Sequence, residues 1–206
     1  MSALTKILKL AEKHEPGPSP VFGREHTLLA FMTVGSSQTI GRQNLARASG
    51  LGEGSMRTVL RKLTGAGYVE TNALGCHMTA SGKRSYSSIS RMISPPVPLH
   101  GSKLTVGESQ VAILVRSLKN SLASGIEQRD SAIRIGAAGA TTYVIKAGKF
   151  SIPGGSNDCE KDFPSKSWSI LRAELNPRDS EVVIVCGAGD ETTAKLGALS
   201  AALTLL

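Results

Sequence analysis

Residues 53–66 are predicted to form a helix with basic and hydroxyl side chains on one face and apolar side chains on the other. The apolar side chains recur at i, i+3, i+4 and i+7, and they are Met56, Val59, Leu60 and Leu63. Arginine can bind guanine through two hydrogen bonds, while serine, threonine and lysine can contact bases or phosphates. The opposite face carries Ser55, Arg57, Thr58, Arg61 and Lys62. This face suits a nucleic acid, and a solvated polar helix face is the alternative.

Position along the chain divides these side chains by expected role. Arg57 and Thr58 lie toward the N-terminal end of the helix, where recognition helices usually meet base edges, so they are the candidates for reading sequence. The remaining candidates are expected to contact the phosphate backbone, and they are Arg42, Gln43, Arg61, Lys62 and Lys83. For Lys83, which follows the predicted strands, a plain solvated helix start is an equal alternative.

The surrounding elements explain how this helix would be presented. A Gly-rich turn at Gly50-Leu51-Gly52 precedes it, with Leu51 directed into the core. Residues 39–40 are long enough for only one β-bridge. Further helices are predicted over residues 24–34, 42–49 and 81–92, and strands over 68–72 and 76–79 with the tip of their loop at 73–75. This order is a helix-turn-helix followed by a wing, which places the third helix where it can enter a DNA major groove.

Charge is distributed unevenly. Residues 1–101 contain 12 Lys and Arg against 5 Asp and Glu, whereas residues 102–206 contain 12 against 11. The excess positive charge therefore lies in the half that carries the predicted helix-turn-helix, which favours a polyanionic partner for that half. A surface charge that only aids solubility is the alternative.

The segment GRQNLARASGLGEGSMRTVLRKLTGAGYVETN, followed by HMTASGKR, resembles the winged helix-turn-helix transcriptional regulators of archaea and bacteria. The turn at Leu51, the LRKLTGAGYVE junction and the MTASGK after the wing carry the resemblance, which covers about residues 24–92. It implies a DNA-binding function. The sequence departs from the family at Gly52 and Gly54, where most relatives have Ser or Thr to cap the recognition helix.

The rest of the chain is predicted to contain an appended N-terminal helix, a spacer and a second domain. Residues 2–14 are amphipathic and end at a Pro-rich segment. Residues 1–92 form the predicted DNA-binding domain, 93–102 a Pro-rich linker and 103–206 the second domain. Its strands are expected over residues 110–118, 141–146, 149–152 and 181–186, and its helices over 121–137, 165–175 and 190–205. This order predicts a ferredoxin-like split βαβ, so the fold class is α+β.

Three polar features of the second domain are candidates for ligand binding. The charged cluster Glu127, Gln128, Arg129 and Asp130 lies on a helix whose other face is apolar, with Ile126, Ile133 and Ala137. The second feature is a stretch of small residues that leads into a strand and contains Thr141. The third lies between a strand and a helix and contains Gly187, Gly189 and Asp190. The alternatives are a solvated helix surface or a subunit contact for the cluster, and a capped turn for Asp190. The segment GIEQRDSAIRIGAAGATT resembles a C-terminal domain found on archaeal winged-helix regulators, from which no activity carries over.

Several classes of chemistry are not expected. The three cysteines are widely spaced and odd in number, which argues against disulfides and zinc sites. We find no nucleophile–base pair and no set of His and Cys at metal-binding spacing, so no catalytic residue, metal or cofactor is predicted. There is no predicted signal peptide and no run long enough to span a bilayer, so a cytoplasmic protein without a membrane partner is expected.

These observations predict a transcriptional regulator that binds double-stranded DNA, with two copies reading two half-sites as a homodimer. The second domain is expected to sense a small molecule or to supply the dimer contact. Two alternatives stay open. The second domain could instead be a small enzyme acting on a nucleotide-like substrate, or the winged helix could be an assembly module that binds protein.

Overall fold

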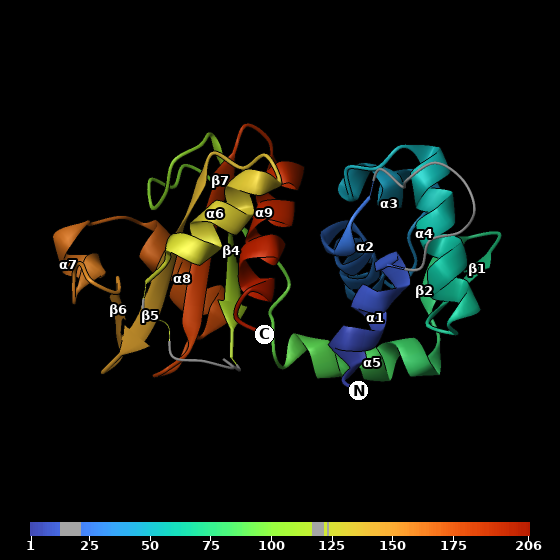
Figure 1. Cartoon of the computed structure of the whole chain (residues 1–206), viewed down its shortest axis with the longest axis horizontal. Helices are drawn as coiled ribbons and strands as arrows, with labels where there is room; N and C mark the ends of the chain where they lie inside the picture. Colours follow the sequence, from blue (N-terminus) through green and yellow to red (C-terminus); the bar gives the residue numbers. More distant parts are fainter. Residues whose placement is uncertain (13–21, 117–121, 123) are drawn as a thin grey trace. The chain divides into compact units, whose positions relative to one another are not determined.

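The computed structural model describes residues 1–12, 22–116, 122 and 124–206, and it divides into two compact units, Met1–Ser90 and Arg91–Leu206. The chain is a mixed α and β protein (Figure 1). Some predictions fall outside the described residues. They are the helix or strand predicted at residues 13–14, 117–118, 121 and 123 and the Pro-rich segment at 15–20. No helix among the described residues is both long and apolar enough to cross a membrane.

Unit 1 contains five helices and one β-hairpin within its described residues. The elements, in chain order, are α1 (Ala3–Glu12), α2 (Arg24–Ser36), α3 (Arg42–Ala48), α4 (Glu53–Gly65), β1 (Val69–Asn72), β2 (Gly75–Met78) and α5 (Ala80–Ser90). The predicted helix bounds are confirmed to within a few residues, and α4 begins at Glu53 although its N-cap, Gly52, supplies no side-chain hydrogen bond.

The apolar stripe of α4 holds that helix against the rest of unit 1. Met56, Val59 and Leu63 have no exposed surface, and Leu60 is 6% exposed. Leu51, in the turn before α4, is also buried, as predicted, and its backbone N–H donates to the carbonyl oxygen of Ala46. Because one face is fully committed to the core, the opposite face of α4 is fixed toward the exterior.

The β1–β2 hairpin is fixed at its tip and along one side. At the tip, Oδ1 of Asn72 accepts hydrogen bonds from the backbone N–H groups of Leu74 and Gly75, at 2.9 and 3.2 Å. Along the side, Ile40 and Cys76 exchange two backbone hydrogen bonds, at 3.0 and 2.8 Å, which confirms the predicted bridge. The hairpin is therefore attached to the segment that leads into α3.

Unit 2 is built on a five-stranded antiparallel sheet with the order β3-β4-β7-β5-β6. The strands are β3 (Val97–Pro98), β4 (Ser109–Val115), β5 (Gly139–Lys146), β6 (Lys149–Ser151) and β7 (Val182–Ala188). The helices are α6 (Ile126–Arg134), α7 (Cys159–Asp162), α8 (Ser167–Leu175) and α9 (Glu191–Leu203).

The neighbouring inner strands β4 and β7 are largely apolar on both faces, and this decides the layering. Every residue of β7, and all of β4 except its first residue, is buried. Helices α6 and α9 lie side by side over one face, where Gly197 of α9 approaches Cys186 of β7 (Figure 1). On the other face, Trp168, Leu171 and Leu175 of α8 join the core cluster with Val183 and Val185. Both faces are covered because a strand with continuous apolar residues must be buried on both sides.

The expected ferredoxin-like arrangement is wrong in its strand order and layering. Each half does contain a split βαβ, since β4 and β5 lie on either side of β7, and β6 and β7 on either side of β5. In a ferredoxin-like sheet, however, the first and third strands are neighbours and the helices share one face. Here the neighbours of β4 are β3 and β7, and helices cover both faces. The order of elements alone does not determine which strands pair.

The segment predicted as a linker, residues 93–102, belongs to unit 2. Ile93 forms a bridge with Val115, and β3 pairs with Ala112 and Val111 of β4. Leu99 is buried in the core cluster of unit 2. Proline is compatible with this role because β3 is an edge strand, where missing backbone donors are tolerated.

Candidate functional site

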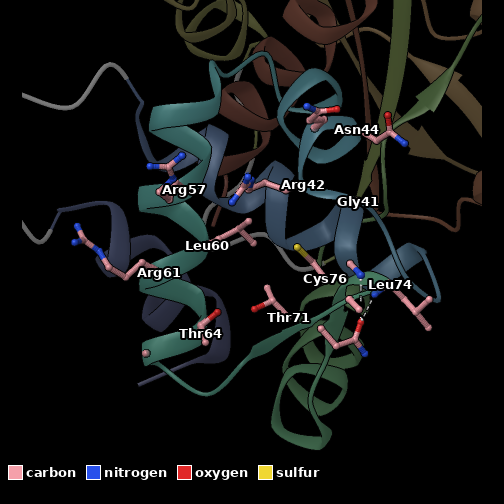
Figure 2. Close-up of a pocket in the computed structure, with 15 residues that line it drawn as sticks. Gly41, Arg42, Asn44, Arg57, Leu60, Arg61, Thr64, Thr71, Leu74 and Cys76 are labelled. Carbon is pink, nitrogen blue, oxygen red and sulfur yellow. Dashed lines mark hydrogen bonds between the residues drawn. The ribbon is translucent and has the colours of Figure 1, made fainter.

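A groove of about 930 Å³ opens in unit 1 between α3, α4 and the β1–β2 hairpin (Figure 2). Three arginines lie along it, and none of the described residues that line it is acidic. The polar and basic lining residues are Arg42, Gln43, Asn44, Arg57, Arg61, Thr64, Thr71, Asn72 and Cys76. A hollow with this lining attracts an anion and offers neutral hydrogen-bonding groups beside the positive charges.

Each arginine is placed by a different structural constraint. Arg42 is the first residue of α3, whose start is fixed through the bridge between Ile40 and Cys76. Arg57 and Arg61 are one helical turn apart on α4, opposite the buried stripe. The groove therefore combines side chains from two helices whose orientations are set by the same core.

Two of the three groove arginines, Arg42 and Arg57, have no acidic partner among the described residues. Two nearby carboxylates have other contacts: Glu53 accepts a hydrogen bond from Nε2 of Gln43 at 3.3 Å, and Glu70 lies 3.6 Å from Nε2 of His77. Because Glu70 and His77 are partners in the hairpin register, they lie on the strand face that does not carry Thr71 and Cys76.

Cys76 lies in the groove lining as a buried, protonated thiol. Burial raises the pKa of Cys76, and the nearby Arg42 guanidinium lowers it by a smaller amount. Cys76, Cys159 and Cys186 are all free and buried. A thiol that is buried and protonated is a poor nucleophile, so Cys76 contributes surface rather than reactivity.

The structure brings together only part of the predicted DNA-binding set. Arg42, Gln43, Arg57 and Arg61 line the groove, whereas Ser55, Thr58, Lys62 and Lys83 do not. Lys62 lies 5.4 Å from the centre of the Phe22 ring, and Oγ1 of Thr58 is 3.4 Å from the carbonyl oxygen of Gly54. Lys83 lines a second hollow of about 470 Å³, with His77 and Tyr86.

Apart from Gln43, the neutral polar residues of the groove were not predicted as site residues. Asn44 lies two residues after Arg42, Thr64 lies seven after Arg57, and Thr71 and Asn72 end strand β1. Helical spacing marks Thr64 as a neighbour of Arg61, so the sequence contained that information. The hairpin residues reach the groove only through the tertiary packing of β2 on Ile40.

The predicted ligand-binding residues of unit 2 do not form one site. Nε2 of Gln128 donates to Oγ1 of Thr204, the C-cap of α9, at 2.7 Å, whereas Asp190 is the N-cap of the same helix. A 13-residue helix is about 20 Å long, so these residues lie at opposite ends of α9. Thr141 pairs with Val185 and lies on the sheet face that carries α8. The predicted set is therefore divided among three places.

Individual contacts give structural roles to several of these residues. Gln128 is 1% exposed and anchors α6 to α9, and Arg129 pairs with Asp130 at 3.1 Å. Asp190 accepts hydrogen bonds from the backbone N–H and Oγ1 of Thr193, at 2.9 and 2.7 Å, and these bonds lower the pKa of Asp190. The alternative of a capped turn is therefore observed for Asp190.

Packing and exposure account for the remaining candidates of that set. At Gly187, a Cβ atom would collide with the carbonyl oxygen of Val106. This glycine therefore permits a close backbone approach. Gly189 and Glu127 are exposed. No group of three or more His, Cys, Asp or Glu that could hold a metal occurs within the described residues.

Comparisons with known proteins find relatives for this architecture. Residues 106–205 match the model of a family described as a domain of unknown function (DUF4443). A solved structure, "Hypothetical protein PH0730 from Pyrococcus horikoshii OT3", is 25% identical and has a TM-score of 0.73; the similarity covers 88% of this chain and 91% of that one. No curated protein matches. The fold likeness thus extends into both units, and neither description names an activity.

Proposed function

We propose that unit 1 is a winged helix that binds double-stranded DNA and that the protein is a transcriptional regulator. Helices α3 and α4 with their intervening turn supply the helix-turn-helix, and the β1–β2 hairpin supplies the wing. The observation that carries the proposal is the groove of unit 1, which three arginines line without any acidic side chain among its described residues. A polyanion is the partner that such a surface selects.

In this proposal α4 enters the major groove of the duplex with its exposed face toward the bases. Arg57 lies in the first half of α4, where recognition helices contact base edges, and Arg42 at the start of α3 contacts the phosphate backbone. The hairpin, with Thr71 and Asn72, lies against the adjoining backbone. A bidentate contact of Arg57 to guanine supplies about 1–3 kcal/mol of base discrimination.

The regulatory part of the proposal rests on the sequence alone. An effector-sensing role for unit 2 gains no support from the predicted ligand set, because that set is divided among three places. The homodimer that would read two half-sites also stays a prediction from the sequence. DNA binding by unit 1 is therefore the part of the proposal that the groove supports.

The test is DNA binding by the full chain, measured by fluorescence anisotropy with a mixed-sequence duplex of about 30 base pairs at several salt concentrations. The variant Arg42→Ala/Arg57→Ala removes two cations that have no acidic partner in the described part of the chain. We expect its affinity to fall at least about tenfold and the slope of log K against log salt to lose about two units. Arg134→Ala, an exposed arginine of unit 2, is the control and is expected to bind as the unchanged protein does.

Three results would contradict the proposal. The first is no duplex binding by the unchanged protein at low salt. The second is equal affinity and equal salt slope for the double variant. The third is loss of a protein partner, rather than of DNA, on substitution of the same arginines, which would favour the assembly module. Turnover of a nucleotide by the unchanged protein without duplex binding would favour the enzyme instead.

A further inference from the structure

Helix α6 has its polarity reversed relative to the usual amphipathic pattern. Ile126 and Ile133 belong to the face of this helix that is predicted to be apolar, yet they are 56% and 47% exposed. The side chains that α6 buries are instead Gln128, Ser131 and Ala132. A helix that exposes two large aliphatic side chains and buries two polar ones needs a specific reason.

Hydrogen bonds to α9 fix α6 in this orientation. Gln128 bonds to Thr204, and Oγ of Ser131 is 2.8 Å from Oγ of Ser200. Rotating α6 to bury the isoleucines would break both contacts and leave the buried hydroxyl of Ser200 without its partner. The exposure of Ile126 and Ile133 is therefore a fixed feature of the fold.

The exposed residues form one stripe with an internal symmetry. Ile126, Arg129, Asp130 and Ile133 stand at i, i+3, i+4 and i+7, directly opposite the buried side of α6. Read from either end, the stripe begins and ends with isoleucine, and its centre pairs one cation with one anion. Arg129 and Asp130 already form an ion pair with each other at 3.1 Å.

We propose that this stripe is a two-fold interface with a second copy of the chain, in which the two α6 helices pack antiparallel. In that arrangement Ile126 of one copy faces Ile133 of the other, and Arg129 of one copy faces Asp130 of the other. Each of these contacts occurs twice because a two-fold interface is self-complementary. The apolar ends are buried and every charge meets its opposite. A second copy is the partner that fits, because a two-fold axis makes it present the same four residues in the reverse order.

The proposed contact is short. The nine residues of α6 span about 14 Å, so the interface is at the small end of specific protein contacts. A dissociation constant on the order of 10 µM is expected for such a contact. The inference does not depend on DNA binding, although a dimer of this kind would place two copies of unit 1 on one duplex.

Charge reversal tests the contact, with sedimentation velocity of the full chain up to about 500 µM as the measurement. Arg129→Asp places like charges opposite each other and is expected to raise the dissociation constant at least about tenfold. Arg129→Asp/Asp130→Arg restores opposite charges and is expected to return within about threefold of the unchanged protein. Arg134→Asp makes the same charge change on the flank of α6 and serves as the control, with no expected effect.

Cysteine pairing tests the register independently. A mixture of Ile126→Cys and Ile133→Cys variants is expected to form a disulfide-linked heterodimer, whereas each variant alone pairs much less because its own cysteines are about 10 Å apart along the helices. A monomeric unchanged protein at the highest concentration would overturn the inference. So would a dimer that Arg129→Asp leaves intact, or a double reversal that fails to restore association. None of these results bears on duplex binding, which is measured separately.

Discussion

The two units use the same charged residue types in different ways. In unit 2, several cations are paired with neighbouring carboxylates, including Arg172 with Glu160, Lys149 with Asp158, Lys195 with Glu191 and Arg129 with Asp130. In the groove of unit 1, Arg42 and Arg57 have no such partner within the described residues. Arginine content alone therefore does not indicate a binding site, whereas arginines that converge on a groove without acidic residues do.

Arg172 illustrates the structural use of charge. Its guanidinium donates to both carboxylate oxygens of Glu160 and to the carbonyl oxygen of Gly148, and it lies 5.1 Å from the centre of the Phe150 ring. These contacts connect α7, α8 and the β5–β6 turn. The hydrogen bonds to Glu160 raise the pKa of Arg172, so this cation is stabilised by its own protein rather than by a partner.

The largest expected effect comes from reversing one arginine in each unit. Arg172→Glu places a carboxylate beside Glu160 and removes the contact with Phe150, so we expect the free energy of unfolding to fall by about 2–3 kcal/mol, measured by urea denaturation. Arg57→Glu is expected to change it by less than about 0.5 kcal/mol while reducing duplex affinity strongly. A stability loss at Arg57 equal to that at Arg172 would remove the distinction between the units.

An intermediate effect is expected at two glycines. Gly75 has φ of 134°, and a Cβ there would lie 2.6 Å from the carbonyl oxygen of Ile40, so Gly75→Ala is expected to cost about 1–2 kcal/mol and to displace the hairpin. Duplex affinity should fall with it, because the hairpin forms one wall of the groove. Gly187→Ala, in unit 2, should lower stability but leave duplex affinity unchanged. Equal affinity for both variants would show that the hairpin takes no part in binding.

The smallest effect is expected at Asp190, whose side chain caps the N-terminus of α9. Asp190→Ala is expected to destabilise the protein by about 1 kcal/mol at pH 7, and Asp190→Asn by less, since asparagine also caps. The pKa of Asp190 is lowered in the folded protein, so its contribution is present above the unfolded pKa near 4 and is lost as pH falls through the folded pKa. Urea denaturation should therefore show the difference between Asp190→Ala and the unchanged protein shrinking toward pH 3. A difference that grew on acidification would assign Asp190 another role.

Local patterns in the sequence were sufficient for most of unit 1. The buried stripe of α4, the turn at Leu51 and the bridge at Ile40 follow from apolar spacing and turn chemistry, which act over a few residues. Arg57 and Arg61 could be assigned to the exposed face for the same reason. The contributions of Thr71 and Asn72 could not, because they depend on where the hairpin packs.

What the sequence determined by itself was the order of most helices and strands, without β3 and α7, together with the uneven charge and the outward face of α4. These features are set by neighbours along the chain. The tertiary structure decided the strand order of unit 2, the inclusion of residues 93–102 in its sheet and the outward direction of Ile126 and Ile133. These features depend on contacts between residues far apart in sequence, such as Gln128 with Thr204. Periodicity describes one element at a time, and pairing energies between elements determine which of its faces is buried.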